Sequence, residues 1–173
     1  MIMINVVLKD GSYKKYDKAM TISEIAKDIS HGLARAAVVG EMDGKPVDLN
    51  TVVDRDCAIN ILTFDDTEGK KAFWHTSSHI LAQAVKRLYP DVKLAIGPAI
   101  DNGFYYDFDT DKHFSPEDLE VIEKEMQKIV QEDFSIERFV LPRDEAIKLM
   151  EDKNEPYKVE LIKELPNDAV ISF

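Results

Sequence analysis

Two histidines four positions apart, His75 and His79, are the residues whose type and spacing most directly suggest chemistry. On a helix this spacing places both imidazoles on one face, one turn apart. Two such imidazoles can bind a metal ion or position one water molecule near neutral pH. Thr76 stands where the helical metalloprotease motif requires a glutamate base, so that chemistry is not indicated. From the spacing alone, two exposed helix histidines without a function are the other open interpretation.

A metal site is not expected in this chain. A zinc site needs a third and usually a fourth ligand, and neither the single cysteine nor the two other histidines has a suitable spacing. An Asp-x-Asp-x-Asp series at 107–111 is similar to the start of a calcium loop, but Lys112 occupies the position that requires glycine. Phosphate-binding fingerprints of the P-loop or dinucleotide type are absent from the sequence. We therefore predict no resident metal and no nucleotide cofactor.

The first 64 residues are expected to form strands around one helix. Ile2, Ile4, Val6 and Leu8 alternate with other residues and predict a strand with one buried face. Further strands are expected at 12–16, 36–42 and 58–64, with tight turns at Asp10-Gly11 and Asp43-Gly44. The intervening helix opens with the capping-box spacing of residues 21–24, and Gly32 is expected to end it. One helix on a small mixed sheet favours a β-grasp, ubiquitin-like fold.

Residues 65–173 are expected to form a second, α+β region around a long helix that carries the histidines. A polar linker or helix entry at 65–71 precedes this helix, which Pro90 ends. Its apolar stripe, which includes Phe73, places the two histidines on the opposite face, beside Ala82 and Lys86. Strands are predicted at 94–100 and 104–108, joined by an Asn-Gly turn, and at 136–141 and 169–173. Helices are predicted at 116–132, after a serine cap, and at 143–151.

Composition narrows the class of protein. Hydrophobic residues make up 45% of the chain, enough for a folded core, and no stretch approaches the length of a membrane span. A single cysteine excludes an internal disulfide and is typical of a reducing compartment, so the cytoplasm is predicted. Residues 1–64 carry a net charge of −1 and residues 65–173 a net charge of −10. Any contact with nucleic acid is therefore expected to be local.

Two long segments of the chain resemble the N-terminal region of bacterial threonyl-tRNA synthetases. LKDGS together with AKDISHGLARAAVVGEMDGKPVDL is similar to the TGS domain of that family, and WHTSSHILAQAVKRLYPDVKLAIGPAIDNGFYYDFD is similar to the start of its editing domain. The segment IGPAIDNGFYYD is long and unusual, whereas HTSSH alone is not specific. The resemblance implies a β-grasp TGS domain at 1–64 and the N-terminal part of the editing domain at 65–173, with the abrupt C-terminal end interpreted as a truncation.

The resemblance also implies roles for particular residues. The family's editing domain hydrolyses serine wrongly attached to threonine tRNA. By this resemblance His75 and His79 would help to position the water and the terminal adenosine. Lys158, which from its context is a solvated charge in a strand, lies in a YKVELI segment similar to that of the family and would steady the substrate or the developing charge. Gly97, Phe104 and Tyr106 match the segment that lines the pocket.

What the chain lacks limits the expected activity. The family completes its site with an aspartate and a Cys-Arg-Gly-Pro-His segment, neither of which is present, so half of a hydrolytic site is expected. ATP, Mg²⁺ and Zn²⁺ would belong to a catalytic domain outside this chain. The implied partners are the acceptor end of threonine tRNA, the remaining domains of the enzyme and a second copy in a homodimer, with no membrane. The alternative function is a non-catalytic TGS module that binds RNA or a ligand.

Overall fold

The computed structural model describes residues 3–173, so Ile2, which the alternation assigned to the first strand, lies outside the described residues. The chain forms two compact units, Met1–Trp74 and His75–Phe173. No helix within residues 3–173 is both long and apolar enough to cross a membrane.

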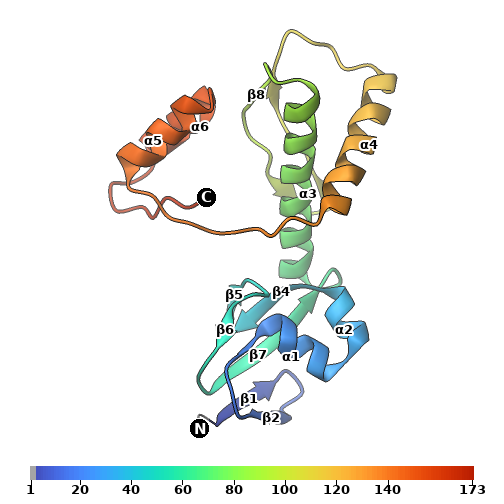
Figure 1. Ribbon diagram of the computed structural model, residues 1–173, viewed down its shortest axis with the longest axis vertical. Coiled ribbons are helices and arrows are strands. Elements are labelled where there is room, and N and C mark those ends of the chain that lie inside the picture. Colours follow the sequence, from blue (N-terminus) through green and yellow to red (C-terminus); the bar gives the residue numbers. More distant parts are fainter. Residues whose placement is uncertain (1–2) are drawn as a thin grey trace. The chain divides into compact units, whose positions relative to one another are not determined.

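The first unit is a mixed sheet with a helix across one face (Figure 1). Strand order is β2-β1-β7-β4-β5, with β1 and β7 parallel and the remaining neighbours antiparallel. The sheet strands are β1 (Ile4–Leu8), β2 (Tyr13–Tyr16), β4 (Ala37–Met42), β5 (Lys45–Val47) and β7 (Cys57–Thr63). A separate pair consists of β3 (Met20–Thr21) and β6 (Val52–Val53), and the helices are α1 (Ile22–Ile29) and α2 (His31–Ala36). This is the predicted β-grasp arrangement.

Local signals explain most of this unit. The Thr21 hydroxyl accepts a hydrogen bond from the Glu24 amide at 3.2 Å, and the Glu24 carboxylate accepts one from the Thr21 amide at 2.7 Å, which completes the predicted capping box. Asp43 and Gly44 both have positive φ, 52° and 78°, as the two-residue hairpin turn between β4 and β5 requires. The core is formed by apolar side chains of α1 against the sheet: Ile4, Val6, Ile22, Ile25, Ala26, Ile59.

The predicted end of the first helix at Gly32 is wrong. The helix ends at Ile29, and Ser30, in an extended conformation, both terminates α1 and caps α2 by accepting a hydrogen bond from the Leu33 amide at 3.0 Å. Gly32 lies within α2. A serine that can cap a following helix was the stronger local signal.

The second unit is built from helices joined by an irregular hairpin (Figure 1). Its elements are the greater part of α3 (Thr67–Leu88), then β8 (Lys93–Leu94), β9 (Ala99–Ile100), β10 (Gly103–Phe104), β11 (Phe108–Asp109), α4 (Pro116–Glu132), α5 (Arg143–Asp152) and α6 (Pro156–Glu164). The two predicted strands around Asn102-Gly103 exist only as four short pieces, in which β9 pairs with β10 and β8 with β11. Between these pairs Asp107 exchanges backbone hydrogen bonds with Ala95 and Ile96, at 3.0 and 2.7 Å, so the hairpin is continuous.

Two small apolar clusters hold this unit together. The first joins α3 and α4 through Ala84, Val85, Ile122 and Ile129, and the second joins α5 and α6 through Ala146, Met150, Val159 and Ile162. The α4 start is as predicted, with Ser115 as cap and Pro116 in the first turn. Phe73, assigned to the apolar stripe, is instead 44% exposed and makes edge contacts with Phe64 and Trp74 in the first unit.

The polar segment 65–71 is the entry to the helix, the second of its two predicted roles, because α3 begins at Thr67. Two further predictions in this region are wrong. The segment 136–141 forms no strand; a single bridge joins Val140 to Ser172, so 169–173 is not a full strand either. Lys158 lies on helix α6 rather than on a strand. Alternation over a few residues does not distinguish a short helix that packs on one side from a strand.

Candidate functional site

The two histidines contact each other directly on α3. Their Nε2 atoms lie 3.0 Å apart, and the rings meet edge to face with centroids 4.5 Å apart. A hydrogen bond between two imidazole nitrogens needs one N–H and one lone pair, so in this arrangement the pair cannot carry a proton on both Nε2 atoms. One Nε2 atom therefore donates this hydrogen bond and the other accepts it, and the tautomers decide which ring is the donor.

The environment of the pair favours a neutral ring at His79. Partial burial lowers the pKa of His79 below its ordinary value, and positive charge on His75 and Lys158 lowers it further. The face of α3 that carries the pair was predicted to be open to solvent. Ser78 and Ala82, which flank His79 on the helix, are nonetheless buried. This side of the helix is therefore partly covered, although both histidines keep much of their own surface exposed.

Lys158 reaches the same site from α6. Its ammonium donates a hydrogen bond to the Ala95 carbonyl oxygen at 2.9 Å and lies 5.9 Å from the centre of the Tyr106 ring. Burial lowers the pKa of Lys158, and the negative charge of Glu155 partly offsets this effect. The effect of its charge on His79 places the ammonium in the electrostatic neighbourhood of the histidine pair. A lysine predicted from its context to be solvated is thus half-buried at the candidate site.

Gly97 and Tyr106 are placed face to face by the hairpin. A Cβ atom on Gly97 would lie 2.0 Å from Cδ2 of the Tyr106 ring, so no larger residue fits without moving the ring. The ring stacks on Phe108 with centroids 5.0 Å apart, and burial raises the pKa of the Tyr106 hydroxyl. Phe104, the third predicted pocket residue, lies in β10 opposite Ala99 and is half-buried. The structure therefore brings Gly97, Tyr106 and Lys158 together, with the histidines nearby.

Two charged residues of this region were missed in the sequence. Glu155 is 7% exposed, and its carboxylate lies 2.8 Å from the Lys86 ammonium. Nothing in the local pattern distinguishes this glutamate from the other acidic residues around it, because its partner is 69 positions away in the chain. Only the tertiary structure, in which the start of α6 lies beside β8 and the end of α3, shows the pair.

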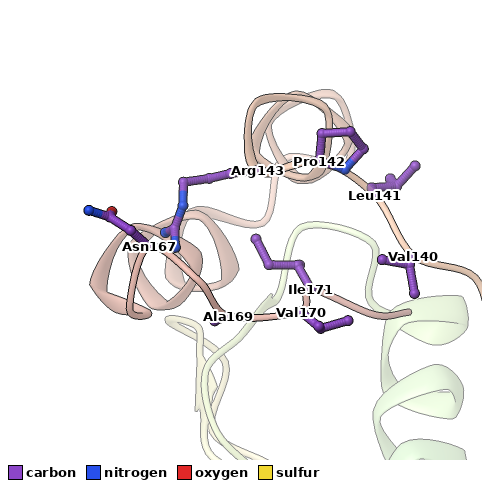
Figure 2. Close-up of a pocket in the computed structure, with 8 residues that line it drawn as sticks. All are labelled: Val140, Leu141, Pro142, Arg143, Asn167, Ala169, Val170 and Ile171. Carbon is purple, nitrogen blue, oxygen red and sulfur yellow. The ribbon is translucent and has the colours of Figure 1, made fainter.

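A surface hollow elsewhere in the second unit contains none of the predicted site residues (Figure 2). It is lined by Val140, Leu141, Pro142, Arg143, Asn167, Ala169, Val170 and Ile171. The Arg143 guanidinium donates hydrogen bonds to the carbonyl oxygens of Ile162, Leu165 and Pro166, at the C-terminal end of α6. This arginine thus holds the backbone after α6. Among residues 3–173, no group of three or more His, Cys, Asp or Glu side chains is placed to bind a metal ion.

The fold and one family match define the class of the first unit. Residues 4–63 match the TGS domain family, whose fold is the β-grasp. These residues include the whole five-stranded sheet and both of its helices. Residues 4–63 of the first unit are therefore a TGS domain.

The whole chain is similar to bacterial threonine–tRNA ligases. It is 63% identical to that of Acetivibrio thermocellus over 171 residues, 62% identical to that of Caldanaerobacter subterraneus subsp. tengcongensis over 168 residues, and 57% identical to that of Clostridioides difficile over 171 residues. These matches cover 99%, 97% and 99% of the chain and 27%, 26% and 27% of the respective relatives. The chain thus spans about a quarter of the length of the relatives that it matches. The resemblance seen in the sequence is confirmed.

Proposed function

We propose that this chain forms part of a threonine–tRNA ligase and contributes to hydrolysis of serine wrongly attached to threonine tRNA. The complete enzyme would join threonine to its tRNA with ATP. In this proposal residues 1–64 are the TGS domain and residues 65–173 belong to the editing domain. The acceptor end of the tRNA, further domains of the enzyme and a second copy would be its partners, in the cytoplasm. The observation that carries the editing function is the convergence of His75, His79, Lys158 and Tyr106 in one unit.

The need for hydrolysis follows from the substrates. Serine differs from threonine by one methyl group, which a binding pocket distinguishes by only about 1–3 kcal/mol. A second site that removes the smaller amino acid after attachment supplies the missing selectivity.

The geometry suits ester hydrolysis. A water molecule attacks the ester carbonyl carbon of the seryl group, and the histidine pair accepts its proton, because His79 is held in the neutral form. Negative charge then develops on the carbonyl oxygen, where the ammonium of Lys158 would stabilise it. The bond to the ribose oxygen breaks, the proton passes to that oxygen, and free serine leaves.

Substitution of the histidines in the full-length enzyme tests this function. We expect His75→Ala and His79→Ala each to slow deacylation of pre-formed seryl-tRNA by about 10²–10⁴-fold. Threonine-dependent pyrophosphate exchange should stay near normal. The free energy of unfolding of the chain should change by no more than about 1 kcal/mol, because both side chains are largely exposed. His113→Ala, an exposed histidine in the same unit, is the matched control.

A second function, RNA or ligand binding without catalysis, is supported by the TGS match over residues 4–63. The same experiment separates the two. Unchanged deacylation in both histidine variants would reject the editing role and leave the binding role as the better account.

A further inference from the structure

The ion pair between Glu155 and Lys86 lies next to the candidate site, and the proposed reaction does not use it. One carboxylate oxygen of Glu155 lies 2.8 Å from the Lys86 ammonium, and the other accepts a hydrogen bond from the Leu94 amide at 3.1 Å. Lys86 also donates to the carbonyl oxygens of Pro90 and Val92, at 3.0 and 2.9 Å. Apart from each other, the two charged groups therefore find their partners in the segment that follows α3.

Stability is a weak reason for such a pair. Removing two charges from water costs free energy that their attraction often only balances, and apolar replacements of similar volume are often neutral or stabilising. In the part of the chain that the structure describes, Glu155 is the one charged residue classed as buried. Its location beside Lys158 points to a role in placing a functional group.

The backbone connects the ion pair to Lys158. Glu155 directly precedes α6, and its carbonyl oxygen accepts a hydrogen bond from the Lys158 amide at 3.1 Å, so the two residues are one helical turn apart. Residues three apart on a helix share a face. The Glu155 carboxylate accepts a hydrogen bond from the Leu94 amide, and the Lys158 ammonium donates one to the carbonyl oxygen of the next residue, Ala95. One short stretch of backbone therefore receives both side chains.

We propose that Glu155, anchored by Lys86, is a positioning residue that fixes the start of α6 and thereby holds the Lys158 ammonium beside Tyr106 and the histidine pair. This inference rests on the proposed editing function. Glu155 would act by positioning Lys158 and would not contact the substrate itself.

The charge of Glu155 has a second consequence for Lys158. Burial lowers the pKa of the lysine and Glu155 raises it, so the carboxylate helps to keep the ammonium protonated. The other ionisable groups around the lysine are Tyr106 on the hairpin and, on α3, Lys86 and His79 with its neighbour His75. Two carboxylates of the hairpin are also near: Asp107 pairs through its backbone with Ala95, and Asp109 accepts a hydrogen bond from the Tyr157 hydroxyl at 2.8 Å. Glu155 is the carboxylate whose charge raises the pKa of Lys158.

Glu155→Gln in the full-length enzyme tests the proposal, because glutamine keeps the size and can still accept the Leu94 hydrogen bond while the charge is lost. We expect seryl-tRNA deacylation near neutral pH to slow by about 10- to 100-fold, as for a small misplacement of a reacting group. The alkaline limb of the pH–rate profile should move to lower pH, since Lys158 then loses its proton more readily. Glu160→Gln, an exposed position on the same helix with the same change in charge, should leave both unchanged.

Three outcomes are distinguishable. A normal rate and an unmoved alkaline limb in Glu155→Gln, with His75→Ala still inactive in deacylation, overturn the positioning role and leave the editing function intact. Normal deacylation in His75→Ala and His79→Ala overturns the editing function itself. Titration of Lys158 by lysine-labelled NMR on the present chain gives a readout independent of activity, and an unshifted titration in Glu155→Gln contradicts the proposal.

If Glu155→Gln does not fold, Glu155→Asp replaces it. Aspartate keeps the charge but withdraws the carboxylate by one methylene, so the rate should fall while the alkaline limb stays in place. A wild-type rate in this variant would overturn the proposal.

Discussion

The TGS unit and the second unit differ in what they bury. The TGS core consists of aliphatic side chains from α1, the sheet and β6, together with Cys57 of β7. In the described part of the chain, the two buried residues with polar or charged side chains, Ser78 and Glu155, both belong to the second unit. The Ser78 hydroxyl donates to the His75 carbonyl oxygen at 2.7 Å, so each buried polar group lies beside a candidate site residue. The interior of the second unit thus contains polar groups next to the candidate site, whereas the core of the TGS unit is apolar.

The units also differ in regularity. The TGS sheet has strands of three to seven residues in continuous register apart from one irregularity in β4. The strands of the second unit are two residues long each. Gly97 and Tyr106 both lie between these short strands, where the backbone is free of a regular ladder and can turn the tyrosine onto the glycine.

The largest effect on stability is expected from the TGS core. Ile25 is fully buried between α1 and the sheet, so Ile25→Ala should cost about 2–5 kcal/mol through lost burial and a cavity. Amide hydrogen exchange should show the loss in residues 4–63, with α4 still protected. Val7→Ala, at a 45% exposed position in β1, is the control and should change little. Equal loss of protection in α4 would show that the two units unfold together, so that their cores are not independent.

A smaller loss of stability and a larger loss of function are expected at the hairpin. Gly97→Ala forces the Tyr106 ring to move, which should destabilise the chain by about 1–3 kcal/mol through overpacking. The displaced ring no longer lies under the Lys158 ammonium, so seryl-tRNA deacylation by the full-length enzyme should fall. Gly32→Ala is the control, because a Cβ there meets no atom closer than 3.9 Å and alanine favours a helix. If Gly97→Ala deacylates seryl-tRNA at the wild-type rate, Tyr106 is not part of the site.

The smallest effect is expected in acid, where the capping boxes of the two units can be compared. Hydrogen bonds from the Ser115 amide, Lys112 and Tyr89 hold the pKa of Asp118 far below its ordinary value of 3.8. The pKa of Glu24 is also lowered, mainly by the hydrogen bonds that its carboxylate accepts from Thr21. A depressed pKa contributes stability that is complete above the ordinary value and is lost as the pH falls below it. Asp118→Asn should therefore flatten the decline of melting temperature between about pH 4 and pH 2 more than Glu24→Gln does. An equal flattening in both variants would show that the additional partners of Asp118 contribute nothing.

Local sequence determined the elements whose signals act over a few residues. The capping boxes at Thr21 and Ser115 and the turn at Asp43-Gly44 form as predicted. The second hairpin turn is displaced by one residue, because Gly103 pairs with Ile100 and the turn is formed by Asp101 and Asn102. A capping box needs only a side chain that binds a nearby backbone amide, and a hairpin turn needs only residues that adopt a positive φ. The spacing of His75 and His79 belongs to the same group, because a helix alone brings two residues four apart into contact.

Tertiary structure decided the rest. Alternation around Lys158 predicted a strand, yet the segment is a helix because Val159 and Ile162 pack against α5. The spacing of apolar residues likewise did not predict that the histidine face of α3 is partly covered or that Lys158 is half-buried. This spacing reports only the position of apolar residues on a helix. Glu155 and Lys86 are not distinguished from other charged residues by the sequence, and only the folded chain brings the two side chains together as an ion pair. An electrostatic interaction depends on distance in space, and no local pattern encodes the distance between residues 69 positions apart.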